Sequence, residues 1–168
     1  MARRRRSSAP EALPAPLPID LDSYAEFIGQ IELDTIWLAS AKVDNRVGPG
    51  TFESVSIQIQ DSARWEPTEM GFRSFSQYSV RFSGKANKPL AKIEATFVVD
   101  YASIAPMTAD VFTIFQEANL PLNTWPHLRE YLSTTLARMN WPPFTLPALK
   151  RGARSSVPGE VPSDESGT

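Results

Sequence analysis

The segment Ala91-Lys-Ile-Glu-Ala-Thr-Phe-Val-Val-Asp-Tyr101 is the strongest indication of the fold, because apolar and polar side chains alternate along it almost without a break. One set of alternate positions is apolar: Ala91, Ile93, Ala95, Phe97, Val99 and Tyr101. The other set carries Lys92, Glu94, Thr96 and Asp100. A period of two residues is typical of a β strand, whose successive side chains point to opposite faces. We therefore expect a sheet in which this strand covers a core.

Three segments upstream show the same period. In the first, Ile31, Leu33, Thr35, Trp37 and Ala39 are expected on one face, and Glu32, Asp34, Ser40 and Lys42 on the other. The second strand runs from Val55 and should be interrupted at Trp65-Glu-Pro67, because proline cannot donate to a central ladder. The third spans Phe72 to Phe82, and Gly84 to Pro89 has hairpin length.

Helical spacing flanks the strands. A short helix capped by Asp20 or Asp22 should end at Gly29, and Thr108 should cap another that ends near Asn119. A longer helix, capped by Asn123 or Thr124, should run to Met139 and stop at Asn140-Trp-Pro-Pro143. Four meandering strands followed by helices predict an α+β, two-layer domain rather than a βαβ fold.

The chain of 168 residues has the length of one domain with tails. Residues 1–18, basic and then proline-rich, are predicted to be a disordered arm, residues 19–151 the folded domain, and residues 152–168 a disordered tail. Prolines interrupt the segment after the Arg3–Arg6 run, so we expect no secretory signal and no membrane span. Because the chain has no cysteine, we expect a cytoplasmic location.

The inventory of reactive residues is small. No cysteine and one histidine exclude thiolate zinc sites and multi-imidazole metal sites. A Ser-His-Asp triad would depend on His127, with no G-x-S-x-G elbow in the chain, and Val47-Gly-Pro-Gly50 suits a turn better than a phosphate loop. We therefore expect no enzyme activity, no metal and no cofactor. A mildly acidic domain also argues against nucleic-acid binding.

Aromatic residues are abundant for one domain: Trp37, Trp65, Trp125 and Trp141, with Tyr131 and Phe144 nearby. Each tryptophan buries about 150–250 Å², so a domain of this size rarely covers them all. Trp37 and Trp125 suit the core. Trp141 and Phe144, in a segment interrupted by prolines, suit an exposed groove or an oligomer interface.

Two segments carry a family resemblance. Trp125-Pro-His-Leu-Arg-Glu-Tyr-Leu132, followed by Trp141-Pro-Pro-Phe-Thr-Leu-Pro147, resembles the C-terminal signature of the SecB export chaperones. The short helix before the first strand is similar to SecB-like chaperones associated with toxin-antitoxin systems. The resemblance implies a four-stranded antiparallel sheet backed by helices, assembly as a dimer of dimers, and apolar grooves for unfolded polypeptide. It implies no cofactor or nucleotide.

The resemblance also implies site residues. The client-binding residues would be Trp37, Trp125, Tyr131, Leu132, Trp141 and Phe144. Arg129 and Glu130 match the helix motif and would serve structure, whereas His127 stands where the family has an aromatic residue.

In SecB the outer face of the sheet is acidic and docks the translocase motor. Here the acidic residues expected to form such a docking patch are Glu32, Asp34, Glu94 and Asp100. Arg73 and Arg81 in the third strand interrupt it.

Two functions follow from these features. The first is an ATP-independent holdase chaperone for unfolded polypeptides, either in protein export or for a dedicated antitoxin. The alternative is a structural or adaptor protein that uses the same aromatic surface to oligomerise and to bind one folded partner.

Overall fold

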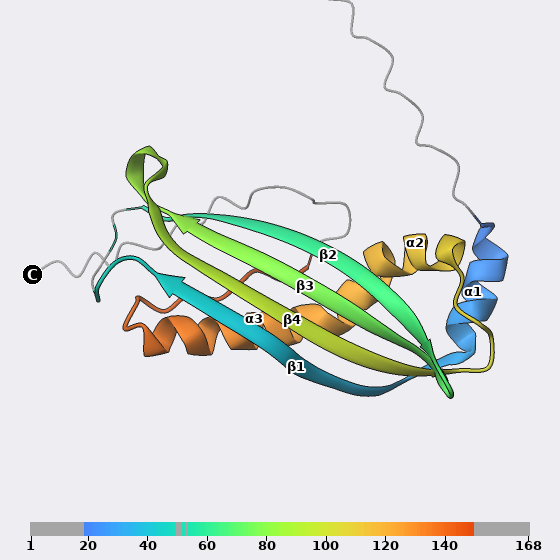
Figure 1. Cartoon of the computed structure of the whole chain (residues 1–168). Helices are drawn as coiled ribbons and strands as arrows, with labels where there is room; N and C mark the ends of the chain where they lie inside the picture. The colour runs from blue at the N-terminus through green and yellow to red at the C-terminus, as the bar shows by residue number, and fades with distance from the viewer. Residues whose placement is uncertain (1–18, 50–51, 53, 150–168) are drawn as a thin grey trace, which may run out of the picture.

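The computed structural model describes residues 19–49, 52 and 54–149. The predicted arm (1–18) and tail (152–168) lie outside the described residues, as do residues 150 and 151. The elements in chain order are α1 (Leu21–Gly29), β1 (Ile31–Asn45), β2 (Ser56–Thr68), β3 (Gly71–Ser83), the 3₁₀ turn η1 (Lys85–Asn87), β4 (Pro89–Ser103), α2 (Ala109–Ala118) and α3 (Leu120–Arg138) (Figure 1). The predicted α+β fold with one four-stranded antiparallel sheet is confirmed.

The strand order is β1-β4-β3-β2, so β1 and β2 form the two edges. The prediction of four meandering strands was wrong for β1, which pairs with β4 rather than with β2. This order places β4, whose alternation is the clearest in the chain, between two neighbours. A strand with one strongly apolar face is stabilised most where both of its edges are paired and that face is covered.

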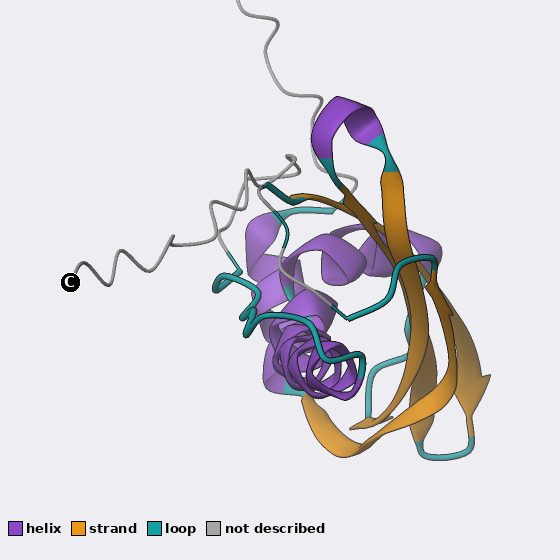
Figure 2. Ribbon diagram, turned by 90° about the vertical axis from the view of Figure 1, so that its left-hand side faces the viewer, coloured by secondary structure: helices purple, strands orange, loops and turns teal. Residues whose placement is uncertain are grey.

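The helices cover one face of the sheet (Figure 2). Leu128, Leu132 and Leu136 of α3 are buried in one core cluster with side chains of β3 and β4. Phe112 and Phe115 of α2 belong to a second cluster, together with residues of α1. The face under the helices is the helix side of the sheet, and the opposite face is its outer side.

The starts of α1 and α2 agree with the sequence. The Asp20 carboxylate accepts a hydrogen bond from the backbone N–H of Ser23 at 2.9 Å, which makes it the cap of α1. Thr108 caps α2 in the same way, accepting from the N–H of Val111 at 3.3 Å.

The predicted start of α3 was wrong, because the helix begins at Leu120 rather than after Asn123 or Thr124. Pro121 lies in the first turn, where a missing N–H costs nothing. Thr124 is buried inside the helix, and its hydroxyl donates to the carbonyl of Leu120 at 3.0 Å. Since that proton is used, the 2.6 Å bond between Tyr78 and Thr124 has the Tyr78 hydroxyl as donor.

The predicted interruption at Trp65-Glu-Pro67 was also wrong, since β2 continues through it to Thr68. Pro67 is tolerated because β2 is an edge strand, in which one side of the backbone has no ladder to supply.

The expected alternation of β1 fails at two β-bulges. The register against β4 shifts between Leu33 and Thr35 and again between Leu38 and Ser40. Each bulge inserts one extra residue and therefore changes which positions face the helices. Leu33 and Leu38 pair with the helix-side residues Tyr101 and Phe97.

Candidate functional site

β1 carries a row of exposed aliphatic residues on the helix side of the sheet. We call Leu33, Ile36, Leu38 and Val43 the helix-side row, because each pairs with a helix-side residue of β4. Leu33, Leu38 and Val43 are 41%, 41% and 42% exposed, and Ile36 is half-buried. Their partners in β4 are buried. Accessibility therefore changes abruptly between two adjacent strands.

The position of α3 explains this change. Its buried leucines pack over β3 and β4, and its half-buried or exposed residues Tyr131 and His127 lie at the margin of that contact. The His127 ring lies 6.2 Å from Phe97, between centroids. The chain thus covers the centre of the sheet and leaves the helix side of β1 accessible.

The aromatic residues of the predicted client set lie near α3 and the segment after it. Trp125 is half-buried, and its indole N–H donates to the carbonyl of Pro147 at 2.9 Å. This hydrogen bond fixes the segment after α3 so that it runs back alongside the helix. Phe144, also half-buried, packs edge-on against Phe82 with centroids 6.2 Å apart.

Two predicted client residues are buried in the chain. Leu132 has no exposed surface, because it faces the sheet from the centre of α3. In this chain Leu132 therefore belongs to the core cluster under α3. Trp141 is 8% exposed, with its ring centroid 4.6 Å from Phe52 and 5.6 Å from Phe82.

Trp37 does not join the other aromatic residues. It pairs with Val98 of β4, so it lies on the outer side of the sheet, opposite α3. The Arg73 guanidinium carbon lies 5.2 Å from the Trp37 ring centroid, and 37% of Trp37 is exposed. The expectation that Trp37 suits the core was wrong, because the bulge between Leu33 and Thr35 turns Trp37 to the outer side, away from the other aromatic residues.

The predicted acidic patch is partly neutralised within the chain. Asp100 accepts two hydrogen bonds from Arg73, at 2.6 and 2.8 Å, which lower the pKa of its carboxyl. Glu94 accepts from Lys92 at 2.6 Å, and this bond lowers the pKa of Glu94. These ion pairs reduce the negative charge that Asp100 and Glu94 can offer to a basic partner.

Glu32 and Asp34 were expected to share a face of the first strand, but only Glu32 has a partner in the β4 register, Ala102. Asp34 is the extra residue of the first bulge. The two carboxylates therefore do not form a regular pair on one face.

The helix motif residues have local roles. Glu130 accepts a hydrogen bond from Thr134 at 2.9 Å, one turn further along α3. The buried Nε of Arg129 has no hydrogen-bond partner among the described residues. Neither residue contacts the helix-side row through a hydrogen bond in the described part of the chain.

Sequence reasoning did not identify Leu38 and Val43 as surface residues. A signal was present, since Ile36 and Leu38 disturb the polar face expected from strict alternation. A bulge explains this disturbance, but its position depends on pairing with β4, which lies more than fifty residues away.

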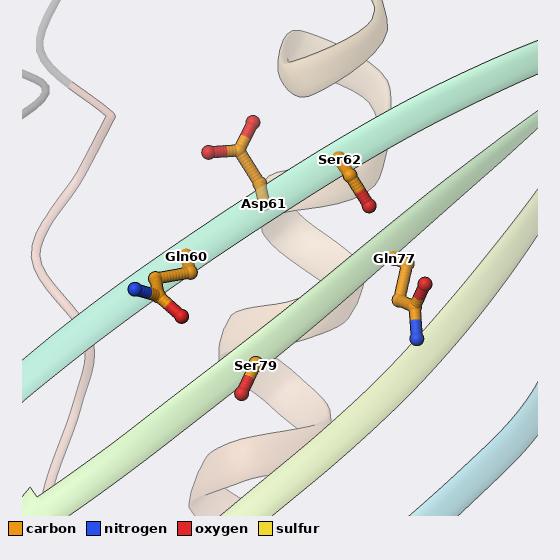
Figure 3. Close-up of a pocket in the computed structure, with 5 residues that line it drawn as sticks. All are labelled: Gln60, Asp61, Ser62, Gln77 and Ser79. Carbon is orange, nitrogen blue, oxygen red and sulfur yellow. The ribbon is translucent and has the colours of Figure 1, made fainter.

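The described residues contain no group of three or more His, Cys, Asp or Glu placed to hold a metal ion. A hollow is lined by Gln60, Asp61, Ser62, Gln77 and Ser79, and Asp61 leaves β2 on the opposite side from Gln60 and Ser62 (Figure 3). In the described part of the chain, no helix is long and apolar enough to cross a membrane.

Comparison with known proteins places this architecture. No family model matches the chain, and no curated protein matches its sequence. Among solved structures, the chain matches the SecB-like chaperone Rv1957 of Mycobacterium tuberculosis, in complex with a ChAD peptide from the Rv1956 HigA1 antitoxin. The TM-score is 0.69 over 79% of this chain and 99% of that one, at 16% identity. The chain has the SecB-like fold.

The resemblance drawn from the segments at Trp125 and Trp141 is thus confirmed at the level of the fold. The chain has the short helix before β1 and the pair of helices after β4 that were predicted.

Proposed function

We propose that this protein is an ATP-independent holdase chaperone that binds non-native polypeptide on the helix side of β1. The helix-side row is the observation that carries the proposal, because it exposes aliphatic side chains in a line along an edge strand. An exposed apolar surface rimmed by polar residues is typical of a protein-binding site.

The binding energy would come from apolar burial. Fully covering an aliphatic side chain is worth about 1.5–3 kcal/mol, and more than half of each row residue is already covered. Each therefore adds roughly 1 kcal/mol when a client buries it. Such small, additive and non-directional terms favour clients with several apolar residues and require little sequence specificity.

Trp125, Tyr131 and Phe144 extend the proposed surface across α3, since each is half-buried. Trp141 lies beneath Phe52 and contributes where a client displaces that ring. Aromatic residues add large contact areas at low entropic cost.

We propose an antitoxin segment as the client, in preference to exported proteins in general. The Mycobacterium tuberculosis chaperone of the same fold is complexed with an antitoxin peptide. The ion pairs of Asp100 and Glu94 also leave little free acidic charge for a basic motor segment. Association into a homo-oligomer in the cytoplasm completes the proposal, because linked row surfaces would hold one client at several points.

The test is suppression of aggregation of an unrelated unfolded protein at near-stoichiometric ratio. The wild-type chain should suppress light scattering, and the Leu38→Ser/Val43→Ser variant should lose most of that activity. The matched control is Met70→Ser/Ile104→Ser, since these two apolar residues are 76% and 92% exposed but lie outside the row.

Equal activity in both double variants would contradict the proposed surface. A wild-type chain that ignores unfolded protein would contradict the holdase function itself. That result would favour the adaptor alternative, for which light scattering should show binding of one folded partner.

A further inference from the structure

The outer side of the sheet, opposite the proposed client surface, carries a second set of exposed groups. One row of cross-strand partners crosses all four strands, in the order Trp37, Val98, Phe75 and Arg64, and two of its members are aromatic. Val98 is buried between its neighbours, although none of the helices among the described residues covers this side. The two aromatic rings therefore form a small apolar platform on a solvent-facing sheet.

Arginine side chains lie over both rings. The guanidinium carbon of Arg64 is 3.4 Å from the centroid of Phe75, and that of Arg73 is 5.2 Å from the centroid of Trp37. Arg73 is committed to Asp100 through two hydrogen bonds. Arg64 has a longer contact with Glu66, at 3.5 Å, and its side chain is mostly exposed. A stacked guanidinium still has N–H groups in its plane to donate to a carboxylate.

A basic cluster lies further along the same face. Lys42, Lys92 and Arg81 lie around one carboxylate, Glu94, whose direct cross-strand partners are Lys42 and Ser79. Lys92 bonds Glu94 at 2.6 Å, and the charges of Lys42 and Arg81 further lower the pKa of Glu94.

The other acidic group beside the cluster is Asp44, the cross-strand partner of Lys92. Its carboxylate is already held by Arg46 at 2.8 Å. Cations thus exceed carboxylates at this end of the outer face, which is the reverse of the acidic docking surface expected from the family resemblance.

The platform and the basic cluster are separated by uncharged residues. Ser40, Thr96, Gln77 and Ser62 form the intervening cross-strand row, and Gln77 and Ser62 line the hollow in Figure 3. Val98 and Glu94 are four residues apart in β4, which is about 13 Å at 3.3 Å per residue. In an extended peptide, side chains four residues apart lie on the same face at the same distance.

We propose that the outer face is a second docking surface, for an extended acidic polypeptide segment with an apolar or aromatic residue four positions from an Asp or Glu. The apolar residue packs against the parts of Trp37 and Phe75 that remain exposed beside the stacked arginines. The carboxylate meets Lys42 and Arg81, the cations of the cluster that have no ion pair in the described part of the chain. Glu66 and Asp100 near the platform repel a continuous phosphate backbone, so a polypeptide suits this surface better than a nucleic acid.

The experiment measures fluorescence anisotropy of a labelled peptide on the full chain. The peptide carries Phe, three serine spacers and then Glu-Ser-Glu, and a second peptide replaces both Glu by Lys. The variant Lys42→Glu/Arg81→Glu should weaken binding of the acidic peptide about tenfold or more, because two attractions become repulsions. Trp37→Ser should weaken it through loss of the platform, and raising salt from about 0.05 to 0.5 M should weaken it in the wild-type chain.

The matched control is Lys85→Glu/Lys88→Glu, which makes the same change in net charge in the turn between β3 and β4. It should leave the affinity unchanged. Every variant keeps the Arg3–Arg6 run, so a selective loss identifies the outer face rather than the N-terminal arginines. Lys42→Gln/Arg81→Gln replaces the double reversal if that variant fails to fold.

Equal weakening by the two charge-reversal variants would overturn the proposal, as would tighter binding of the lysine peptide. Binding of a single-stranded oligonucleotide that competes with the acidic peptide and is lost in the same variant would also overturn it. Aggregation suppression should be unchanged in Lys42→Glu/Arg81→Glu, since the helix-side row is intact in that variant.

Discussion

The two edge strands of the sheet differ in how the chain treats their helix-side residues. In β2, Ile57 is buried, and Trp65 lies against Phe112 of α2 with centroids 6.2 Å apart. In β1, Leu38 and Val43 stay more than two-fifths exposed. Aliphatic residues occupy the helix side of both strands, so composition does not explain the difference. The difference in exposure comes from the segments that cover each strand.

The segments that follow β1 and α3 account for the coverage of β2. Val47, Phe52 and Phe144 pack against the core cluster that contains Ile57. β2 also keeps an unbroken register with β3 from Ser56 to Thr68, whereas β1 has two bulges against β4. β1 therefore presents an apolar surface that the other described parts of the chain leave accessible.

The largest expected effect is on stability. Ile57→Ala in β2 should lower the free energy of unfolding by about 2–5 kcal/mol, because it removes buried methyl groups and leaves a cavity. Leu38→Ala in β1 should cost roughly 1 kcal/mol or less, since the side chain is partly exposed in the folded state. Urea unfolding of the two variants measures both values, and equal losses would contradict the difference in coverage.

An alkaline titration tests how sharply coverage ends. Tyr101, the cross-strand partner of Leu33, is buried, and this burial raises its pKa to about 12. Its neutral form is favoured in the folded state, so the stabilisation is complete below about pH 10 and is lost as pH rises towards 12. Between pH 9 and pH 11.5, the free energy of unfolding measured with urea should fall on the order of 2 kcal/mol through Tyr101, and Tyr24, whose pKa burial also raises to about 12, adds to this loss.

Tyr101→Phe should reduce this alkaline loss, because its side chain does not titrate. A wild-type midpoint that stays constant up to pH 11.5 would show that Tyr101 is not buried beside β1.

A smaller effect is expected on the acid side, from the outer face. Arg73 lowers the pKa of Asp100, so the ion pair stabilises the fold above about pH 3.8 and loses its effect as pH falls through the lowered value. Asp100→Asn should remove this part of the acid dependence. Because both side chains are partly exposed, the change at neutral pH should be at most about 1 kcal/mol, measured by thermal unfolding.

Local signals in the sequence predicted much of the fold. The helix caps at Asp20 and Thr108 depend on neighbouring residues only. In β4, the alternation of apolar and polar residues indicates directly which face is covered. The family resemblance of the segments at Trp125 and Trp141 predicted the overall architecture. Such features require no knowledge of distant contacts.

The rest depended on pairing between distant segments. Strict alternation put Leu33 and Trp37 on one face, and the single bulge that separates them, between Leu33 and Thr35, exists only in the register with β4. Pro67 was misjudged because edge position is a property of the sheet. Leu132 is apolar, as a client-binding residue would be, but its side chain points towards the sheet and is buried in the core.

The most direct test of the account uses the absence of cysteine from the chain. Leu38→Cys and Ser40→Cys place single thiols on opposite faces of β1, and Gln60→Cys places one on β2. Each is labelled with a benzophenone maleimide and irradiated with an unfolded client polypeptide that contains no Asp or Glu, so that the outer face has no acidic segment to bind. We predict strong cross-linking from position 38 and little from positions 40 and 60, whereas equal cross-linking from all three, or most from β2, would contradict the proposed client surface.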